Sequence, residues 1–217
     1  MIASKINSEV KIGLFFGSFN PIHIGHLAIA NIMAENTDLN KVWFVVSPQN
    51  PLKPSKGLLH EFDRYDMVKA AIADNYKFDV SDVEFHLPKP SYTIYTLAYL
   101  REKHPDKEFI VILGEDNLEN FTKWKNHEEI LNQFSLYIYP RPTESFGQAR
   151  PTESSGRASP RVTNSPLKSH AHVKMVDAPL FDISATYIRQ CVSNNKSIRY
   201  LVPEAVEQMI RTKGFYK

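Results

Sequence analysis

Six short runs of apolar residues alternate along the chain with longer segments that have helical spacing. The runs span residues 12–16, 42–47, 78–85, 109–113, 134–139 and 173–176. Continuous apolar runs of this length are typical of parallel strands that are buried on both faces. Asp79, Ser81 and Asp82 interrupt the third run, so we interpret it as a short strand region.

The intervening segments have the residue types and spacing of helices. We expect helices at residues 24–34, 60–73, 126–133 and 201–216, one that runs to about residue 103 and one that begins after Ser184. The apolar side of the second helix consists of Phe62, Tyr65, Met67, Val68, Ala71 and Ile72. Asp63 and Arg64 on the same helix are interpreted as solvated or structural. Strands that alternate with helices predict an α/β fold, a Rossmann-like open parallel sheet with helices on both faces and further helices at the C-terminus.

Length and composition limit the class of protein. The 217 residues suit a single domain, 1–217, and 42% hydrophobic residues suffice for a full core. A net charge of +2 gives no basic field that would favour a nucleic-acid partner. Cys191 is the single cysteine, so no disulfide forms within the chain. Residues 1–10 are mostly polar and lack the apolar core of a signal peptide, and no apolar run approaches the roughly 20 residues that span a bilayer. We therefore expect a cytoplasmic protein without a membrane partner.

The segment 141–170 differs in composition from the rest of the chain. The sequence Arg-Pro-Thr-Glu-Ser occurs at 141–145 and again at 150–154, and the segment is poor in apolar residues. Such a segment cannot bury enough surface to offset the entropy lost on ordering. We therefore predict a flexible surface insertion at 141–170. The sequence leaves open whether this insertion is a lid, a contact for a partner or neither. A homo-oligomer is also possible.

The first apolar run leads into a glycine turn and then into a helix. Gly17 and Ser18 mark the turn, and Asn20 and Pro21 are interpreted as the N-cap and the first-turn proline of the helix. This strand–turn–helix arrangement gathers backbone N–H groups and the positive end of a helix dipole at one point. The stretch therefore predicts a site for an anion such as phosphate.

Two histidines occupy the predicted helix start. His23 and His26 are three residues apart and share a face of the first turn. Gly25 between them has no side chain, so a bulky group could approach the backbone closely. A lone histidine is more often a surface or capping residue, but the context of strand, glycine turn and helix start favours a phosphate site here.

A second helix start, late in the chain, has a similar character. Ser184 is predicted to cap it, and the Thr186 hydroxyl and the Arg189 guanidinium follow within it. Hydroxyls and N–H groups at a helix start donate to anions, and an arginine side chain offers a fork for phosphate. Lys53, in the proline-rich loop after the second strand, could also reach a phosphate.

Three other polar residues could act as helix caps, and the sequence alone does not separate this role from a role in binding. Ser91 or Thr93 could cap the helix that runs to Lys103. Asp116, just past the fourth strand, could cap the following helix or accept hydrogen bonds from ribose hydroxyls, and both roles can coexist.

These motifs resemble those of a known superfamily. Gly-Ser-Phe-Asn-Pro-Ile-His-Ile-Gly-His-Leu at 17–27 is similar to the signature of H-x-G-H nucleotidyltransferases, and Ile-Ser-Ala-Thr-Tyr-Ile-Arg at 183–189 to their second signature. These enzymes join a nucleotide to a phosphate acceptor and release pyrophosphate. The resemblance implies that His23 and His26 are catalytic. It implies ATP-binding roles for Gly17, Ser18, Phe19, Gly25, Lys53, Ser184, Thr186 and Arg189.

Later motifs resemble the branch that acts on nicotinate mononucleotide. These are Pro-Ser-Tyr-Thr at 90–93 and Gly-x-Asp with a later Phe-x-x-Trp-Lys at 114–125. The resemblance implies that Thr93 contacts the pyridine end of this substrate and that Trp124 packs against its ring. Substrate-binding roles are also implied for Asp116 and Arg141. Trp43, which no motif supports, is interpreted as structural.

The sequence departs from the family pattern at three positions. Phe16 stands where glycine is frequent, and Asn20 stands where aspartate is frequent. Asparagine keeps the capping ability and loses the charge, so we interpret both changes as tolerated. Tyr95 stands where aspartate is often found two residues after the threonine, which leaves the role of position 95 open.

The resemblance implies a specific reaction. ATP and nicotinate mononucleotide would give nicotinate adenine dinucleotide and pyrophosphate, with Mg²⁺ arriving with ATP and no protein metal site. The alternatives are an adenylyl- or cytidylyltransferase for another acceptor, such as nicotinamide mononucleotide or phosphopantetheine, or a nucleotide-binding regulator without catalysis. Thr93 and Trp124 favour the nicotinate acceptor, and intact His23 and His26 disfavour the regulator.

Overall fold

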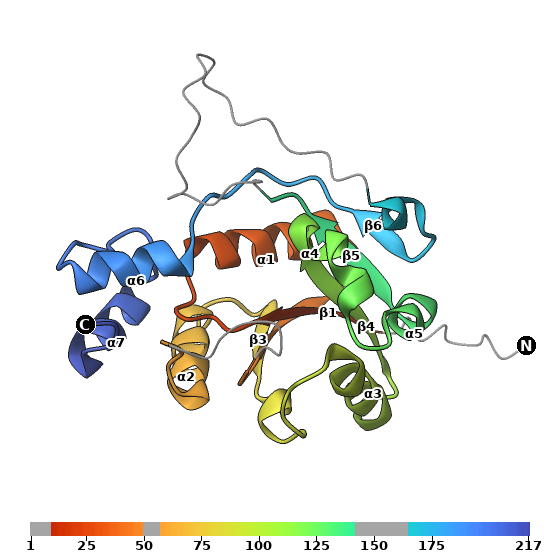
Figure 1. Ribbon diagram of the computed structural model, residues 1–217, viewed down its shortest axis with the longest axis horizontal. Helices are drawn as coiled ribbons and strands as arrows, with labels where there is room; N and C mark the ends of the chain where they lie inside the picture. The colour runs from red at the N-terminus through yellow and green to blue at the C-terminus, as the bar shows by residue number, and fades with distance from the viewer. Residues whose placement is uncertain (1–9, 50–56, 142–164) are drawn as a thin grey trace, which may run out of the picture.

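A computed structural model describes residues 10–49, 57–141 and 165–217. Its six strands form one sheet in the order β3-β2-β1-β4-β5-β6, and every neighbouring pair is parallel (Figure 1). The strands are β1 Val10–Gly17, β2 Lys41–Val46, β3 Phe78–Ser81, β4 Lys107–Gly114, β5 Ser135–Tyr139 and β6 Val173–Met175. This sheet confirms the predicted Rossmann-like α/β fold.

The helices follow the strands in alternation. They are α1 Ile24–Asn36, α2 Glu61–Ala71, α3 Thr93–Lys103, α4 Glu115–Glu119, α5 His127–Gln133, α6 Ala185–Ser193 and α7 Glu204–Lys213. Three short 3-10 helices are η1 Val83–Phe85, η2 Phe121–Lys123 and η3 Pro166–Ser169. The third apolar run thus divides into β3 and η1. Among the described residues, no helix is long and apolar enough to cross a membrane.

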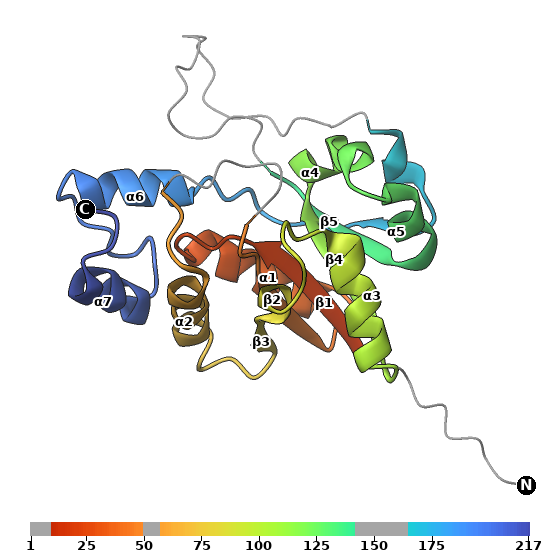
Figure 2. The same cartoon turned by 60° about the horizontal axis from the view of Figure 1, so that its bottom comes forward.

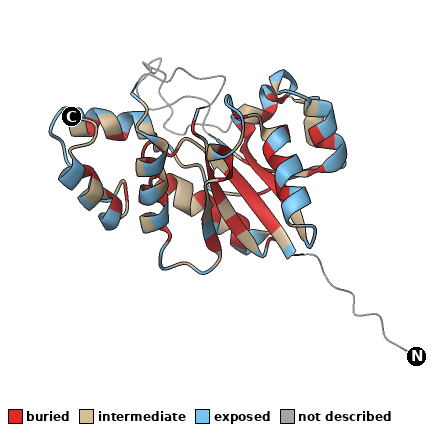
Figure 3. Ribbon diagram, turned by 90° about the horizontal axis from the view of Figure 1, so that it is seen from below, coloured by how far each residue is buried: buried red, intermediate tan, exposed pale blue. Residues whose placement is uncertain are grey.

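The side chains of the strands alternate between two apolar cores. On one face, Phe15 of β1 and Phe44 of β2 pack with α1, α2, α6 and α7. On the other face, Leu14 of β1 and Val111 of β4 pack with α3, α4 and α5. Figure 3 shows the central strands as buried and the outward sides of the helices as exposed. Burial on both faces explains why the strands are continuous apolar runs.

The sheet has a switch point at its centre. β1 pairs with β2 on one side and with β4 on the other, so the chain builds the sheet outward in opposite directions from β1. In open α/β sheets, ligands bind at the carboxyl ends of the strands where the strand order reverses. We therefore expect a binding site beside Gly17 and Gly114, the last residues of β1 and β4.

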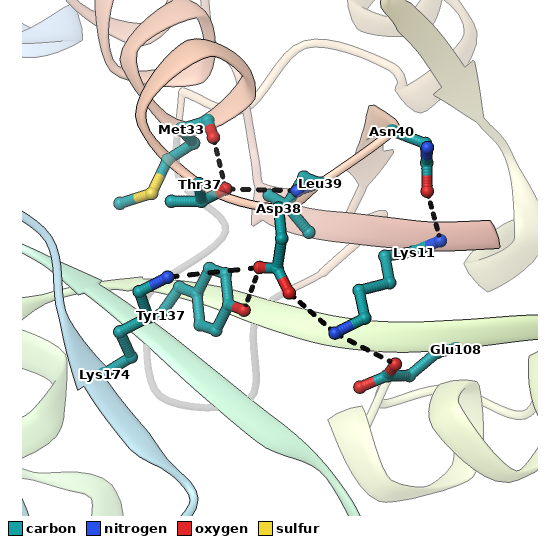
Figure 4. A network of polar contacts seen from close by, with 9 residues as sticks. All are labelled: Lys11, Met33, Thr37, Asp38, Leu39, Asn40, Glu108, Tyr137 and Lys174. Carbon is teal, nitrogen blue, oxygen red and sulfur yellow. Dashed lines mark hydrogen bonds and ion pairs between the residues drawn. The ribbon is translucent and has the colours of Figure 1, made fainter. Parts of the chain in front are cut away.

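The amino-terminal end of the sheet is held by a polar network (Figure 4). Asp38 lies between α1 and β2; it accepts a hydrogen bond from Lys11 Nζ at 2.6 Å and one from the Tyr137 hydroxyl. Lys174 Nζ lies 4.0 Å from Asp38, and Glu108 lies 3.5 Å from Lys11. The hydrogen bond from Lys11, followed by that from Tyr137, lowers the pKa of Asp38 to about 2. The network joins β1, β4, β5 and β6 at the end of the sheet away from the expected site.

The C-terminal helices continue one of the two cores. α7 lies beside α2, as the views of Figures 1 and 2 both show, and Val206 and Ile210 of α7 belong to the core of α1 and α2. The predicted packing helix at 201–216 is thus α7, with Pro203 as its N-cap. One predicted apolar position is wrong: Phe62 of α2 is 57% exposed and stacks on the His60 ring instead of entering the core.

Three of the predicted helix caps are wrong. α1 begins at Ile24 with His23 as its N-cap, so Asn20 and Pro21 lie before the helix. The Asn20 side chain is engaged elsewhere, donating to Gly57 O at 2.9 Å and accepting from the Tyr216 hydroxyl at 2.9 Å.

The other two wrong caps belong to α3 and α4. The N-cap of α3 is Tyr92, without a side-chain hydrogen bond, so neither Ser91 nor Thr93 caps it. The N-cap of α4 is Gly114, and Asp116 lies within that helix. Ser184 is confirmed as the N-cap of α6, since its Oγ accepts from Tyr187 N at 3.2 Å.

Most of the predicted insertion at 141–170 lies outside the described residues. Its last residues are more regular than we predicted, because they form η3. Lys168 of η3 makes an ion pair with Glu115 at 2.7 Å, which attaches this segment to the start of α4. The single-domain assignment and the flexibility of the insertion stay predictions.

Candidate active site

A cavity of about 840 Å³ lies at the carboxyl ends of β1 and β4. Most of the predicted site residues line it: Gly17, Ser18, Phe19, His23, His26, Thr93, Trp124, Arg141, Ser184, Thr186 and Arg189. The charged residues in the described part of its lining are Lys123, Lys125, Arg141, Arg189 and one acid, Glu84. An excess of positive charge in one cavity suits a polyanion. Lys53, the remaining predicted phosphate contact, lies outside the described residues.

The two histidines form a stacked pair on the wall of this cavity. Their ring centroids are 3.6 Å apart and their planes are inclined by 24°. His26 Nδ1 accepts a hydrogen bond from the His23 backbone N–H at 3.3 Å. A neutral His26 therefore carries its proton on Nε2, because the hydrogen bond to one ring nitrogen fixes the tautomer. The Phe15 and Phe19 rings pack edge-on against His26 and fix its orientation.

His23 is the more buried member of the pair. The side chain is 5% exposed, and its Nδ1 has no hydrogen-bond partner among the described residues. Burial, assisted by the positive charge of Arg141, lowers the pKa of His23 from 6.5 to about 3. The imidazole is therefore neutral at physiological pH.

This buried neutral imidazole predicts a pH dependence of stability. Below pH 6.5 the unfolded chain binds a proton at His23 that the folded chain does not bind until about pH 3. The free energy of unfolding should therefore fall with decreasing pH across this window, with His23 contributing about 1.4 kcal/mol per pH unit. Urea denaturation between pH 4.5 and pH 7.5 should show a shallower slope for His23→Asn than for the parent. His86→Asn, which removes an exposed imidazole, is the matched control; parallel curves for parent and His23→Asn would refute the prediction.

Three glycines let other groups approach closely. A Cβ on Gly17 would lie 2.7 Å from the Phe19 ring, and one on Gly114 would lie 2.5 Å from Arg141 Cδ. A Cβ on Gly25 would lie 3.2 Å from His23 Nδ1. Gly25 is buried and does not line the cavity. Its missing side chain therefore makes room for the His23 ring, not for the ligand.

The start of α6 closes the cavity on the histidine side. Arg189 Nη1 donates to Asn20 O at 2.7 Å, and its Nη2 donates to Thr186 Oγ1 at 3.2 Å. These bonds join α6 to the turn between β1 and α1, although the two segments are far apart in sequence. The two predicted signatures therefore meet at one place, with the Ser184 cap and the Arg189 fork beside the histidine pair.

The part of the cavity lining contributed by the segment between α4 and α5, on the other side of the sheet from α6 in Figures 1 and 2, is aromatic. Trp124 follows η2, is half-buried and lies against Phe121, with ring centroids 5.2 Å apart. Tyr92 and Thr93 reach the same cavity from the start of α3. A tryptophan face beside an uncapped helix start suits a flat, electron-poor ring that carries an anionic group. Trp43 does not line the cavity and packs against His104 and Phe109, consistent with the structural interpretation.

Arg141 and Asp116 form an ion pair at the edge of the site. Arg141 Nη1 lies 3.4 Å from Asp116 Oδ2, and both side chains are about half exposed. Arg141 lines the cavity and Asp116 does not. The carboxylate therefore orients the arginine in this structure, and contact of Asp116 with a ribose stays a prediction.

Two buried ionisable residues near the site were not assigned to it from the sequence: Arg64, whose structural interpretation holds, and Glu84, which no motif singled out. Arg64 of α2 is fully buried and donates to the backbone oxygens of Ser18, Ser47, Pro48 and Leu59. Glu84 of η1 is 2% exposed and accepts from Thr96 Oγ1 at 3.0 Å, and burial raises its pKa. No short motif predicts the contacts of either residue. The position of Arg64 on the buried side of a helix, close to Met67 and Val68, was nevertheless a signal for a buried cation.

The fold and the cavity together define a nucleotidyltransferase. Residues 14–191 match the family model described as Cytidylyltransferase-like. A Cytophaga hutchinsonii protein named probable nicotinate-nucleotide adenylyltransferase is 58% identical over 207 residues, which cover 95% of this chain and 98% of that protein. The Bacteroides fragilis protein of the same name is 42% identical, with 94% of this chain and 92% of that protein covered. The chain belongs to the nicotinate-nucleotide adenylyltransferase family.

Solved structures agree on the fold. A Plasmodium falciparum nicotinic acid mononucleotide adenylyltransferase complexed with NaAD has a TM-score of 0.75 at 19% identity, covering 95% of this chain and 97% of that chain. A Vibrio parahaemolyticus structure, a putative nicotinate-nucleotide adenylyltransferase by name, has a TM-score of 0.65 at 20% identity, covering 95% of both chains. At these identities the likeness shows the fold alone.

Proposed function

We propose that this protein transfers the adenylyl group of ATP to nicotinate mononucleotide, giving nicotinate adenine dinucleotide and pyrophosphate. One observation supports this proposal above the others. A single cavity holds the stacked histidine pair and the Arg189 fork at one end and Trp124 at the other. The first end suits a triphosphate, and the second suits an aromatic ring.

The proposed reaction requires the protein to position the two substrates and to stabilise the charge that develops on the phosphate oxygens. An oxygen of the mononucleotide phosphate attacks the α-phosphorus of ATP, and the bond from that phosphorus to the bridging oxygen of the β-phosphate breaks. The electron pair leaves with pyrophosphate, and no proton must be removed because the attacking oxygen is already anionic. Catalysis then rests on in-line alignment and on stabilising the charge that develops on the phosphate oxygens.

The proposed roles follow from the positions of the side chains. His26 donates from Nε2 to a phosphate oxygen, and His23 supplies a second imidazole donor beside it. Arg189, Thr186 and Ser184 hold the polyphosphate at the start of α6. We assign the backbone of Gly17, Ser18 and Phe19 to the nucleotide. Thr93 and Trp124 take the pyridine end of the acceptor.

Mg²⁺ enters this scheme with ATP. No group of three or more histidine, cysteine, aspartate or glutamate residues in the described part of the chain could hold a metal ion. The side chains at the phosphate end are imidazoles, hydroxyls and guanidinium groups, which bind phosphate oxygens. When bound with ATP, Mg²⁺ would supply positive charge that offsets the charge of the leaving pyrophosphate. We propose that the reaction takes place in the cytoplasm.

A substrate panel tests the proposal. Pyrophosphate release is measured with ATP or CTP and with nicotinate mononucleotide, nicotinamide mononucleotide or phosphopantetheine as acceptor. We expect the highest kcat/KM for ATP with nicotinate mononucleotide, since only this acceptor carries an aromatic ring with a carboxylate for the aromatic end of the cavity. A preference for phosphopantetheine or for CTP would refute the proposal, and absence of turnover with every pair would favour the nucleotide-binding regulator.

A further inference from the structure

A lysine is held between two tyrosine rings at the aromatic end of the cavity. Lys125 Nζ lies 4.6 Å from the ring centroid of Tyr92 and 4.7 Å from that of Tyr95. The two rings meet edge to face at 5.9 Å and 88°. Tyr92 and Tyr95 come from the start of α3, and Lys125 directly follows Trp124. The contact therefore joins the segment after η2 to the start of α3 and fixes a flexible side chain in one place.

The contact holds the ammonium group without cancelling its charge. A tyrosine face attracts a cation through its quadrupole and brings no negative charge of its own. Lys125 forms no ion pair with an acidic residue in the described part of the chain. A hydrogen bond with Tyr95 raises the pKa of Lys125, so the side chain is positively charged at neutral pH. A carboxylate at position 95 would hold the lysine equally well and neutralise it.

The ammonium lies in the right part of the cavity to act on a ring substituent. Lys125, Thr93 and Trp124 all line it. Ser91 and Glu84 also line the cavity, and both are buried. Glu84, with a pKa raised by burial, is the one acid among the described lining residues.

We propose that Lys125, fixed by Tyr92 and Tyr95, is a specificity-determining residue that favours the pyridine carboxylate over the carboxamide. The inference rests on the proposed function, because it concerns the acceptor of that reaction. The two mononucleotides have nearly the same shape, and they differ in charge at the ring substituent. An uncompensated cation nearby lowers the free energy of the anionic acceptor and leaves that of the neutral substituent almost unchanged.

The test compares kcat/KM for the acid with kcat/KM for the amide mononucleotide, at saturating ATP. In Lys125→Met this acid-to-amide ratio should fall by about fivefold to tenfold, a modest effect because the ammonium group is exposed and its attraction for the carboxylate is screened by solvent. Lys125→Arg keeps the charge and should keep the ratio within about twofold. Tyr95→Asp leaves the lysine in place but neutralises it, and should lower the ratio as Lys125→Met does.

A matched control lies on α3, the helix that carries Tyr95. Lys103 Nζ lies 5.5 Å from the Tyr99 ring centroid near the far end of α3, so Lys103→Met also removes a lysine–tyrosine contact. It should leave the acid-to-amide ratio unchanged. If Lys125→Met lowered kcat/KM equally for both mononucleotides, the lysine would only hold the segment after η2 against the start of α3, and the inference would be wrong. If the parent used neither mononucleotide, the proposed function itself would fail, which separates the two failures.

Discussion

His26→Ala is expected to lower kcat for adenylyl transfer by a factor of about 10² to 10³, the usual effect of removing one positioned donor to a developing charge. The His26 ring is held by a hydrogen bond from the His23 backbone and by the Phe15 and Phe19 rings. Its Nε2–H is therefore oriented before the substrate arrives. Pyrophosphate release under saturating ATP and nicotinate mononucleotide measures the effect.

Two further variants separate catalysis from folding. His26→Gln retains an amide that can accept from the His23 backbone and donate to a phosphate, and it should keep more activity than His26→Ala. His86→Ala removes an exposed imidazole outside the cavity and should leave kcat unchanged. Turnover of His26→Ala within a factor of two of the parent, in a variant that melts cooperatively, would exclude the catalytic role.

The fold was predictable because its four central strands, β2, β1, β4 and β5, are largely buried on both faces. Five of the six apolar runs correspond to single strands of the sheet. The remaining one, the third run at 78–85, is interrupted by polar residues and forms β3 and η1. Burial on both faces leaves little choice but a parallel sheet covered by helices. Helix starts were less predictable. Asn20, Ser91 and Asp116 all have side chains that cap helices well, yet tertiary bonds or neighbouring residues decide where those helices begin.

The candidate site was predictable where the chemistry is local in sequence. The histidine pair and the start of α6 each lie within one short motif, and the structure brings the two motifs together through the Arg189–Asn20 bond. The contacts of Glu84 and Arg64 are not local. Arg64 reaches backbone atoms 46, 17 and 16 residues away, and no pattern of side-chain types records the position of a backbone carbonyl.

Those contacts make Arg64 the support of the loops around the cavity. Its Nη1 donates to Ser18 O at 2.6 Å and to Ser47 O at 2.8 Å. Its Nε donates to Leu59 O at 2.9 Å, and its Nη2 donates to Pro48 O at 3.1 Å. One planar group thus connects the turn after β1, the loop after β2 and the segment before α2. Burial lowers the pKa of Arg64, but an arginine remains charged near neutral pH, so the four bonds are charge-assisted.

We accordingly expect Arg64→Met to lower the free energy of unfolding by about 3–5 kcal/mol. The methionine fills a similar volume, but four backbone carbonyls lose their donor, and each buried carbonyl without a partner costs about 1 kcal/mol or more. The cost of burying the charge is released at the same time, which limits the loss. Urea denaturation at neutral pH measures the change. Activity at a temperature where the variant is folded should fall too, because Ser18 and Ser47 line the cavity.

Arg64→Lys tests whether charge alone is sufficient. An ammonium group is a compact point charge and cannot reach carbonyls on several sides as the guanidinium fork does, so this variant should recover only part of the lost stability. Arg211→Met, which removes an exposed arginine from α7, is the control and should change the free energy of unfolding by less than about 0.5 kcal/mol. A loss below about 1 kcal/mol in Arg64→Met would mean that water or a backbone shift satisfies the carbonyls, and that the loops around the cavity are held by other contacts.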